Sequence, residues 1–333
     1  MQEAEKILEI KGLYKSFKSN KEEVTILRNI NLVVNEKESV AVIGESGCGK
    51  TTLGKVIVDI FQPTQGTVKY RGKDISKMTK KEYQAYRLKV QMVQQDSFAA
   101  LNPYKTIFHS VSTAMIQHKI VKGEKAARIK VTELLEDVGL TPVEHFIDKY
   151  PHQLSGGQRQ RILIARALSV NPELIIADEP VSMVDVSLRI ALLQLLRKMN
   201  EKYGVSFVYI THDLATARYI SDTGKLVVMY LGEIVEQSAI TTAVKNPLHP
   251  YFKALVQAVP QATPGGNFKG AELQLKGIDV PDVKNVPSGC PFHPRCIYAT
   301  AECEKIKPQL EKVGDSQVAC LYTREIQQKL VAK

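Results

Sequence analysis

Residues 44–51 read GESGCGKT, between an apolar run at 39–43 and a helical pattern at 52–61. The stretch fits G-x-x-x-x-G-K-[ST], the glycine-rich loop that joins a buried strand to a helix. Glycines at 44, 47 and 49 let backbone N–H groups turn inward around phosphate oxygens, and the helix adds its positive N-terminal end. The stretch therefore predicts an α/β fold with a nucleotide phosphate site. The alternative is a glycine-rich turn that binds nothing.

Several residues of this loop have predicted roles. Lys50 reaches the β- and γ-phosphates, Thr51 offers its hydroxyl to Mg²⁺, and Thr52 adds a phosphate contact. Cys48 lies beside Lys50 at a helix N-terminus, which predicts a lowered thiol pKa and modification by thiol reagents that ATP prevents. A small space-filling role is the alternative for Cys48. The predicted ATP-contacting residues of the loop are Gly44, Glu45, Ser46, Gly47, Cys48, Gly49, Lys50, Thr51 and Thr52.

A second acidic motif follows an apolar strand, ELIIADE at 173–179. It brings Asp178 and Glu179 to the carboxyl end of that strand, where ligands of open α/β sheets bind. Asp178 is predicted to hold Mg²⁺, and Glu179 to polarise the attacking water as a general base. The alternative, two acidic residues that only end a strand, is weakened by the phosphate loop upstream.

LSGGQ at 154–158 resembles the signature of the ATP-binding-cassette (ABC) family. The resemblance implies that Ser155, Gly156, Gly157 and Gln158 open a helix and contact the γ-phosphate of ATP held by a partner subunit. A serine hydroxyl, two glycine N–H groups and a helix N-terminus do make an anion site. The alternative is a plain helix cap.

The resemblance implies further roles. Tyr14 in GLYKSF stacks on adenine, Gln95 in VQQD joins the metal site to a helical subdomain and takes part in catalysis, and His212 in YITHD contacts the γ-phosphate and orders the attacking water. Asp185 touches the opposite active site. SMVD at 182–185 departs from the more usual SALD, which alters apolar bulk in a dimer contact.

The order of patterns predicts the organisation of the chain. Short apolar alternations and strand–helix alternation predict a largely parallel sheet that resumes after a helical interruption. The expected fold is a P-loop NTPase ABC cassette of class α/β, with a mixed sheet core, an inserted helical subdomain at about 97–170 and a small irregular C-terminal metal-binding extension. The Pro/Gly-rich stretch QATPGGNFKG at 261–270 predicts a boundary between an ATPase domain, 1–259, and the extension, 260–333.

Four of the five cysteines lie within the last part of the chain, in CPFHPRC at 290–296 and beyond it. Together with NPLHPY at 246–251, the arrangement resembles the C-terminal extension of peptide-importer ATPases, where such cysteines hold a [4Fe-4S] cluster of structural role. Zinc is the rival, although structural zinc sites usually begin with cysteines two to four residues apart. Inert thiols are a further alternative, and His293 is expected to pack and not to ligate. The predicted ligands are Cys290, Cys296, Cys303 and Cys320.

Composition and charge limit the function classes. With 333 residues the chain can bury a full core and carry an appendage. No apolar run approaches the roughly 20 residues of a membrane-spanning helix, and MQEAEKILEI lacks the features of a secretory signal. The formal charge of +10 is dispersed along the chain, and no nucleic-acid partner is expected.

The resemblance therefore implies the ATP-hydrolysing subunit of an ABC importer of peptides, peripheral at the cytoplasmic face of the membrane. Its expected ligands are ATP and Mg²⁺. Its expected partners are permease subunits, a second identical or paralogous ATPase and an extracytoplasmic substrate-binding protein. Oligosaccharide or nickel uptake, a soluble ABC ATPase and a catalytically dead sensor are alternatives. The sensor would tolerate loss of Glu179 or His212, yet the chain has both.

Overall fold

The computed structural model describes residues 5–19, 22–258 and 275–323. The chain forms two compact units, each built from separate segments. The first unit comprises Met1–Ile7, Val34–Glu38 and Tyr70–Tyr209, and the second comprises Leu8–Val33, Ser39–Lys69 and Ile210–Lys333. The boundary predicted at residue 260 lies outside the described residues.

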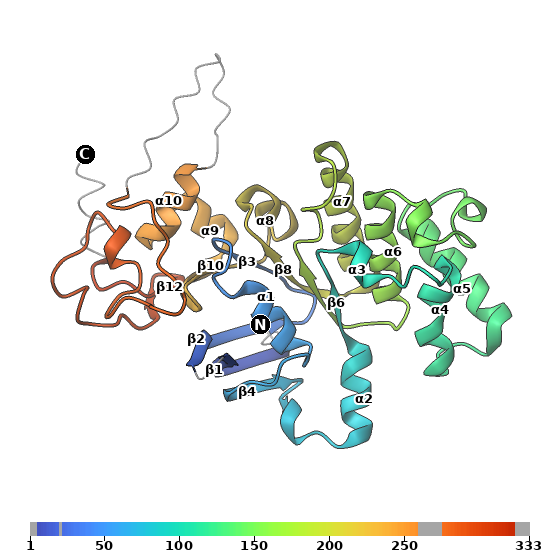
Figure 1. The fold of residues 1–333 in the computed structure, drawn as a ribbon, viewed down its shortest axis with the longest axis horizontal. Coiled ribbons are helices and arrows are strands. Elements are labelled where there is room, and N and C mark those ends of the chain that lie inside the picture. The colour runs from blue at the N-terminus through green and yellow to red at the C-terminus, as the bar shows by residue number, and fades with distance from the viewer. Residues whose placement is uncertain (1–4, 20–21, 259–274, 324–333) are drawn as a thin grey trace, which may run out of the picture. The chain divides into compact units, whose positions relative to one another are not determined.

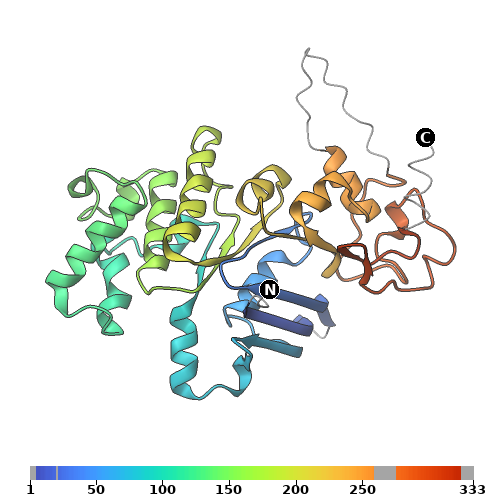
Figure 2. The ribbon, with the colours of Figure 1, turned by 180° about the vertical axis from the view of Figure 1, so that it is seen from behind.

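The second unit contains the glycine-rich loop at 44–51 and the strand that precedes it. β3 is the buried strand of the sequence prediction, and it pairs in parallel with β9. β9 and β10 form the predicted hairpin, in which Glu233 lies opposite Tyr230. Figure 1 shows β1, β2 and β4 as neighbouring strands of a second sheet, and Figure 2 shows them from behind. The elements mainly in this unit are β1 (Lys6–Ser19), β2 (Glu22–Asn35), β3 (Ser39–Ile43), α1 (Lys50–Ile57), β4 (Gln65–Tyr70), α8 (Leu214–Ile220), β9 (Lys225–Tyr230), β10 (Glu233–Ala239), α9 (Ile240–Lys245), α10 (Pro250–Ala258), η4 (His293–Arg295), β11 (Glu311–Val313) and β12 (Ser316–Val318).

The C-terminal extension is built onto the second unit by strand pairing and by a shared core. β12 pairs with β10, and β11 pairs with β12, so part of the extension is regular and not irregular as the sequence suggested. Phe292 and Cys296 of the extension pack in one hydrophobic cluster with Ile43, the last residue of β3. The extension therefore shares its core with the strand that leads into the phosphate loop.

The first unit contains the predicted helical subdomain. β6 and β7 pair in parallel, from Val90 opposite Leu174 to Val93 opposite Ala177. The helices α4, α5 and α6, which the sequence periodicity predicted, pack on one another, and α6 also packs on β6 (Figure 1). Helix α2 has a complete capping box, Thr79 with Glu82, which the sequence analysis did not use. The elements mainly in this unit are β5 (Lys73–Asp74), η1 (Ile75–Lys77), α2 (Lys80–Lys89), β6 (Val90–Val93), α3 (Ser97–Ala100), α4 (Ile107–Gln117), α5 (Gly123–Asp137), η2 (Val143–His145), η3 (Pro151–Gln153), α6 (Gly156–Leu168), β7 (Leu174–Asp178), α7 (Val186–Tyr203) and β8 (Ser206–Thr211).

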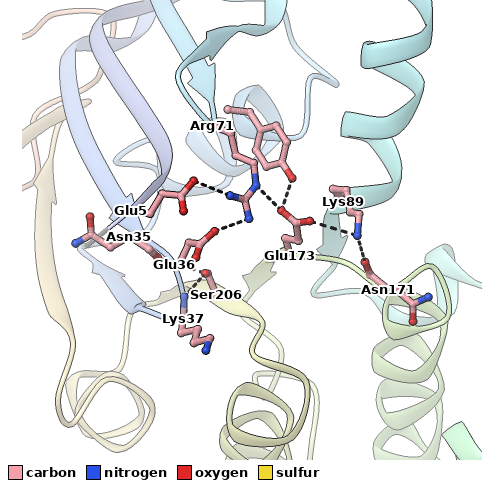
Figure 3. Close-up of polar contacts among 10 residues, drawn as sticks. Glu5, Asn35, Glu36, Lys37, Arg71, Lys89, Asn171, Glu173 and Ser206 are labelled. Carbon is pink, nitrogen blue, oxygen red and sulfur yellow. Dashed lines mark hydrogen bonds and ion pairs between the residues drawn. The ribbon is translucent and has the colours of Figure 1, made fainter. Parts of the chain in front are cut away.

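An ion-pair network joins the three chain segments that make up the first unit (Figure 3). The Arg71 guanidinium pairs with the carboxylates of Glu5, Glu36 and Glu173, and Lys89 reaches the other oxygen of Glu173 at 3.3 Å. Single exposed pairs contribute little, but a network of several charges around one guanidinium is worth more than its isolated pairs. The network fixes the start of β7, the strand that carries Asp178.

Candidate nucleotide-binding site

The loop after β3 has two positions, Gly44 and Gly49, at which a side chain would clash with neighbouring atoms. A Cβ on Gly44 would lie 2.2 Å from the Met229 carbonyl oxygen. Gly49, the N-cap of α1, has φ +104°, and a Cβ there would lie 2.9 Å from Leu27 Cδ2. Both constraints follow from backbone packed against backbone and core, so this loop is a fixed structure.

Lys50 points back across this loop. Its Nζ donates to the Gly44 carbonyl oxygen at 2.7 Å and to the Glu45 carbonyl oxygen at 3.0 Å, and the residue is 6% exposed. The ammonium is thus held inside the turn of the loop by neutral acceptors. Anionic phosphate oxygens are stronger acceptors than carbonyls for such a charge.

The prediction of a lowered pKa at Cys48 is wrong. The thiol is 3% exposed, and burial raises its pKa above the ordinary value, although Lys50 pulls in the opposite direction. The neighbouring charge of Lys50 is visible in the sequence but the depth of the side chain is not, and burial is the larger effect. Cys48 is therefore a buried, protonated thiol that is a poor target for thiol reagents.

Glu45 of the loop is held by residues from the C-terminal part of the chain. The Arg295 guanidinium donates to both carboxylate oxygens of Glu45, at 2.8 and 2.9 Å, and the Glu45 N–H donates to the Tyr251 hydroxyl at 2.8 Å. The sequence analysis assigned no role to Arg295 or Tyr251. They stand in the quoted stretches CPFHPRC and NPLHPY, but nothing in these stretches indicated partners 250 and 206 positions away.

A buried carboxylate holds the backbone of the NPLHPY stretch in place. Glu236 of β10 accepts the backbone N–H groups of Leu248 and His249, just before α10. Burial raises the pKa of Glu236 to about 7 in spite of these bonds. The contact fixes the start of α10 and with it the position of Tyr251 at the phosphate loop.

The remaining predicted residues of the second unit lie on β1, on α1 and after β8. Tyr14 is half-buried on β1, Thr51 is exposed on α1, and Thr52 is half-buried. His212 directly follows β8 and is exposed, ahead of helix α8. The Asp213 side chain caps α8 by accepting the Ala215 N–H at 2.8 Å, which fixes the backbone beside His212.

In the first unit, Asp178 and Glu179 end β7 as predicted. Asp178 is buried, and Glu179 is half-buried with φ +44°, a left-handed conformation that is uncommon for a residue with a side chain. Ser182 supports this turn, because its hydroxyl and its N–H both donate to the Glu179 carbonyl oxygen, at 2.9 and 3.2 Å. A strained backbone at a carboxylate is a feature of functional sites.

The signature stretch opens α6 with a complete capping box. Ser155 is the N-cap, and its side chain accepts the Gln158 N–H while the Gln158 side chain accepts the Ser155 N–H. A Cβ on Gly156 would lie 3.2 Å from the Met183 carbonyl oxygen. The signature can therefore cap the helix and bind an anion at the same time. Because Gly156 has no side chain, the 182–185 segment can lie close to the start of α6. That segment ends at Asp185, the exposed N-cap of α7.

Gln95 lies between β6 and α3 and is half-buried. Asp96, the next residue, caps α3 by accepting the N–H groups of Phe98 and Ala99. The buried side chain of Gln160 on α6 donates to the Gln94 carbonyl oxygen at 3.5 Å. The segment is therefore fixed to the helix that begins at the signature. The predicted residues divide between the units: the phosphate loop, Tyr14 and His212 are in the second, and Gln95, the signature, Asp178, Glu179 and Asp185 are in the first.

Comparison with known proteins extends over most of the chain. A family model described as "ABC transporter" matches residues 27–182, and one described as "Oligopeptide/dipeptide transporter, C-terminal region" matches residues 235–303. The oligopeptide transport ATP-binding protein AppF of Bacillus subtilis is 40% identical over 304 residues, which cover 90% of this chain and 91% of AppF. The chain belongs to the ATP-binding subunits of ABC transporters, in the oligopeptide/dipeptide group. It is thus an ATPase of the ABC type.

Other members of this group and solved structures agree. The ABC subunit OppF of Escherichia coli, named for oligopeptide transport, is 41% identical over 88% of this chain and 86% of its own length. A dimeric ATP-binding cassette in a post-hydrolysis state with ADP and Pi is 32% identical and covers 70% of this chain and 98% of its own, with a TM-score of 0.63. The predicted ABC cassette with a mixed sheet is confirmed.

The four C-terminal cysteines of this ABC subunit are free thiols that lie near one another. Burial and the other three cysteines together raise the pKa of Cys290 to about 12. Burial and neighbouring cysteines likewise raise the pKa of Cys296 to about 11. The Cys290 N–H donates to the Cys303 carbonyl oxygen at 2.8 Å, and His293 Nδ1 lies 2.9 Å from the Cys290 carbonyl oxygen. Within residues 5–19, 22–258 and 275–323, no group of three or more His, Cys, Asp or Glu is arranged to hold a metal ion. The metal-binding character of the extension is thus not established by the structure.

In the part of the chain that the structure describes, no helix is both long and apolar enough to cross a bilayer.

Proposed function

We propose that this chain powers the uptake of peptides through a separate membrane permease, as the ATP-hydrolysing subunit of an ABC importer. The observation that carries the proposal is the fixed phosphate loop, in which Lys50 lies across the carbonyls of Gly44 and Glu45. The similarity to proteins named for oligopeptide and dipeptide transport supports the peptide cargo. Uptake of oligosaccharides or nickel by the same motor is the alternative.

The roles proposed for the chain's own residues follow from their chemistry. Lys50 and the loop N–H groups bind the β- and γ-phosphates, and Tyr14 stacks on the adenine. Glu179 takes a proton from the attacking water as general base, and His212 orients that water and contacts the γ-phosphate. Thr51, Gln95 and Asp178 supply the oxygen ligands that Mg²⁺ prefers. When bound, Mg²⁺ neutralises charge that develops on the β- and γ-oxygens.

A second ATPase subunit is proposed to complete each site. Ser155 and Asp185 are exposed at two helix N-termini, and Met183 between them is 62% exposed. A helix N-terminus with a serine hydroxyl and glycine N–H groups attracts the γ-phosphate of ATP on a partner. We therefore propose that the signature and Asp185 act across an ATPase dimer, whether the partner is identical or paralogous.

The wider assembly follows from this role. We propose that the subunit lies at the cytoplasmic face of the membrane, bound to permease subunits, and that an extracytoplasmic substrate-binding protein delivers the peptide. The ATPase domain is proposed to span 1–259 and the extension 260–333, with the helical subdomain at about 97–170. No nucleic-acid partner is proposed.

Peptide uptake tests this function. The permease subunits and their ATPases, reconstituted in vesicles with the substrate-binding protein, should accumulate a labelled peptide when MgATP is supplied on the ATPase side. A labelled oligosaccharide and nickel are the matched alternatives under the same conditions. ATP-dependent accumulation of either one without accumulation of any peptide would contradict the peptide assignment.

We propose in addition that Cys290, Cys296, Cys303 and Cys320 hold a [4Fe-4S] cluster, with zinc as the alternative. Thiolates are the ligands that iron–sulfur clusters and zinc take. Neighbouring cysteines raise the pKa of Cys290, Cys296 and Cys320, and a bound cation would remove that cost of ionisation. The proposed role of the cluster is structural.

Metal analysis decides between iron and zinc. The protein purified without oxygen should contain iron and sulfide, about four of each per chain, and should be brown. Cys296→Ser should lose the colour, because a hydroxyl ligates iron far less well than a thiolate. Cys48→Ser is the matched control, since Cys48 lies in the phosphate loop, and it should keep the iron. Stoichiometric zinc without iron would contradict the cluster.

A further inference from the structure

An acidic side chain lies in the phosphate loop of this subunit. Glu45 directly follows Gly44, and its carbonyl accepts Lys50 Nζ at 3.0 Å. A carboxylate this close to the binding place of a polyphosphate repels it, since like charges at short range in a partly desolvated site disfavour each other. The loop therefore needs something to offset the charge of Glu45.

Arg295 provides that charge with a defined geometry. Its guanidinium makes a bidentate pair with Glu45, at 2.8 and 2.9 Å, and the arginine side chain is only 6% exposed. Burial lowers the pKa of Arg295, but the bonds to Glu45 outweigh it, and the pKa is raised above the ordinary value. A fork-to-fork pair of this kind combines charge with fixed direction.

The surroundings keep Arg295 in this position. The guanidinium lies 5.8 Å from the ring centroids of both Tyr230 and Phe292, and Phe292 packs in the core cluster that contains Ile43 of β3. The Nε of Arg295 is buried without a hydrogen-bond partner in the described structure. Burial of this cation costs free energy, and the ion pair with Glu45 offsets that cost. Without Glu45 the buried charge would be uncompensated.

The extension also covers the same face of the loop. A cavity of about 220 Å³ is lined by residues 45–48 and by residues 280–283. Arg28 of β2 anchors this cover, because it donates to the Val283 carbonyl oxygen at 3.1 Å and to the Leu231 carbonyl oxygen at 3.3 Å. Arg28 thus contacts the extension without contacting Glu45, and it can serve as a control.

We propose that Arg295 is a positioning residue for ATP binding: it neutralises Glu45 and turns its carboxylate away from the phosphates, so that the C-terminal extension is part of the nucleotide site. The inference rests on the proposed binding of ATP by the 44–52 loop. It goes further by giving the extension a role in nucleotide affinity.

Double substitution tests this proposal. In the full-length chain, Arg295→Gln should raise the Kd of MgATP by about tenfold or more, the size expected for one lost charge-assisted pair next to an anion. Glu45→Gln in addition to Arg295→Gln should restore the affinity to within about threefold of wild type, because the repelling charge is then gone. If Arg295 only supports the fold, the affinity lost in Arg295→Gln does not come from the charge of Glu45, and Glu45→Gln does not restore it.

Two further variants make the result decisive. Arg28→Gln, which loosens the extension but leaves Glu45 paired, should keep the Kd within about twofold. If Arg295→Gln does not fold, as judged by circular dichroism, Arg295→Lys keeps the charge and should bind ATP more tightly than an Arg295→Met variant that folds. The proposal is overturned if Arg295→Gln binds ATP like wild type, if Glu45→Gln fails to rescue it, or if Arg28→Gln weakens binding equally.

The proposed function fails in a different way. In that case the wild-type chain does not bind MgATP, or Lys50→Ala binds it as tightly as wild type. If wild type binds MgATP and Lys50→Ala does not, ATP binding by the loop is supported. The double substitution then tests the role of Arg295 alone.

Discussion

Glu179→Gln should bind ATP like wild type and hydrolyse it roughly 10²- to 10⁴-fold more slowly, the contribution of a general base. The amide has the shape of the carboxylate but cannot take the proton of the attacking water. The left-handed backbone at Glu179 should persist, because the hydroxyl and the N–H of Ser182 hold its carbonyl in either variant. Because bound ATP is hydrolysed so slowly, ATP-bound dimers should accumulate, and gel filtration with ATP should detect them.

Glu173→Gln is the matched control for this prediction. Glu173 precedes β7 and pairs with Arg71 and Lys89 at the opposite end of the strand from Glu179. Its substitution should leave turnover within about twofold of wild type, while the protein loses a little stability. Wild-type turnover in Glu179→Gln would mean that another group takes the proton.

Lys50→Ala should weaken the binding of MgATP by about ten- to a hundredfold, because it removes the charge that faces the β- and γ-phosphates. Among the described residues, this ammonium donates to loop atoms, the Gly44 and Glu45 carbonyl oxygens and, at 3.8 Å, Cys48 Sγ. The loop glycines are unaffected by the change, so the fold should remain. Isothermal titration with ATP measures the effect.

Lys55→Ala provides the comparison on the same helix. Lys55 lies in the last turn of α1, where its ammonium is 5.5 Å from the ring centroid of Phe61. Its loss should leave the Kd of ATP within about twofold. If both lysine variants bind ATP as tightly as wild type, the phosphate site assigned to residues 44–52 is wrong.

Local patterns predicted most of the fold. The apolar run before Gly44, the alternation of 26–35 and the three- and four-residue spacing in 108–120 and 126–140 each became the expected element. Helix α2 was missed because its residues are mostly polar and give no apolar stripe. The β11–β12 hairpin was missed because its strands are only three residues long and depend on pairing with β10.

The parts of the candidate site that consist of consecutive residues could be predicted from the sequence. The phosphate loop, the 178–179 carboxylates and the signature are such stretches, and each lies at the end of the element expected for it. The pKa of Cys48 was predicted with the wrong sign, because depth below the surface is a property of the whole fold. The Arg295–Glu45 pair could not be predicted either, since no pattern in one sequence joins positions 250 residues apart.

Two roles underlie the proposed ATPase activity: residues 44–52 bind ATP, and Glu179 takes the proton of the attacking water. The most direct test measures MgATP affinity and phosphate release on the same preparations of wild type, Lys50→Ala and Glu179→Gln. The account predicts that the two losses separate: Lys50→Ala loses affinity, and Glu179→Gln keeps affinity but loses phosphate release. Equal affinity and equal release in all three proteins would contradict it.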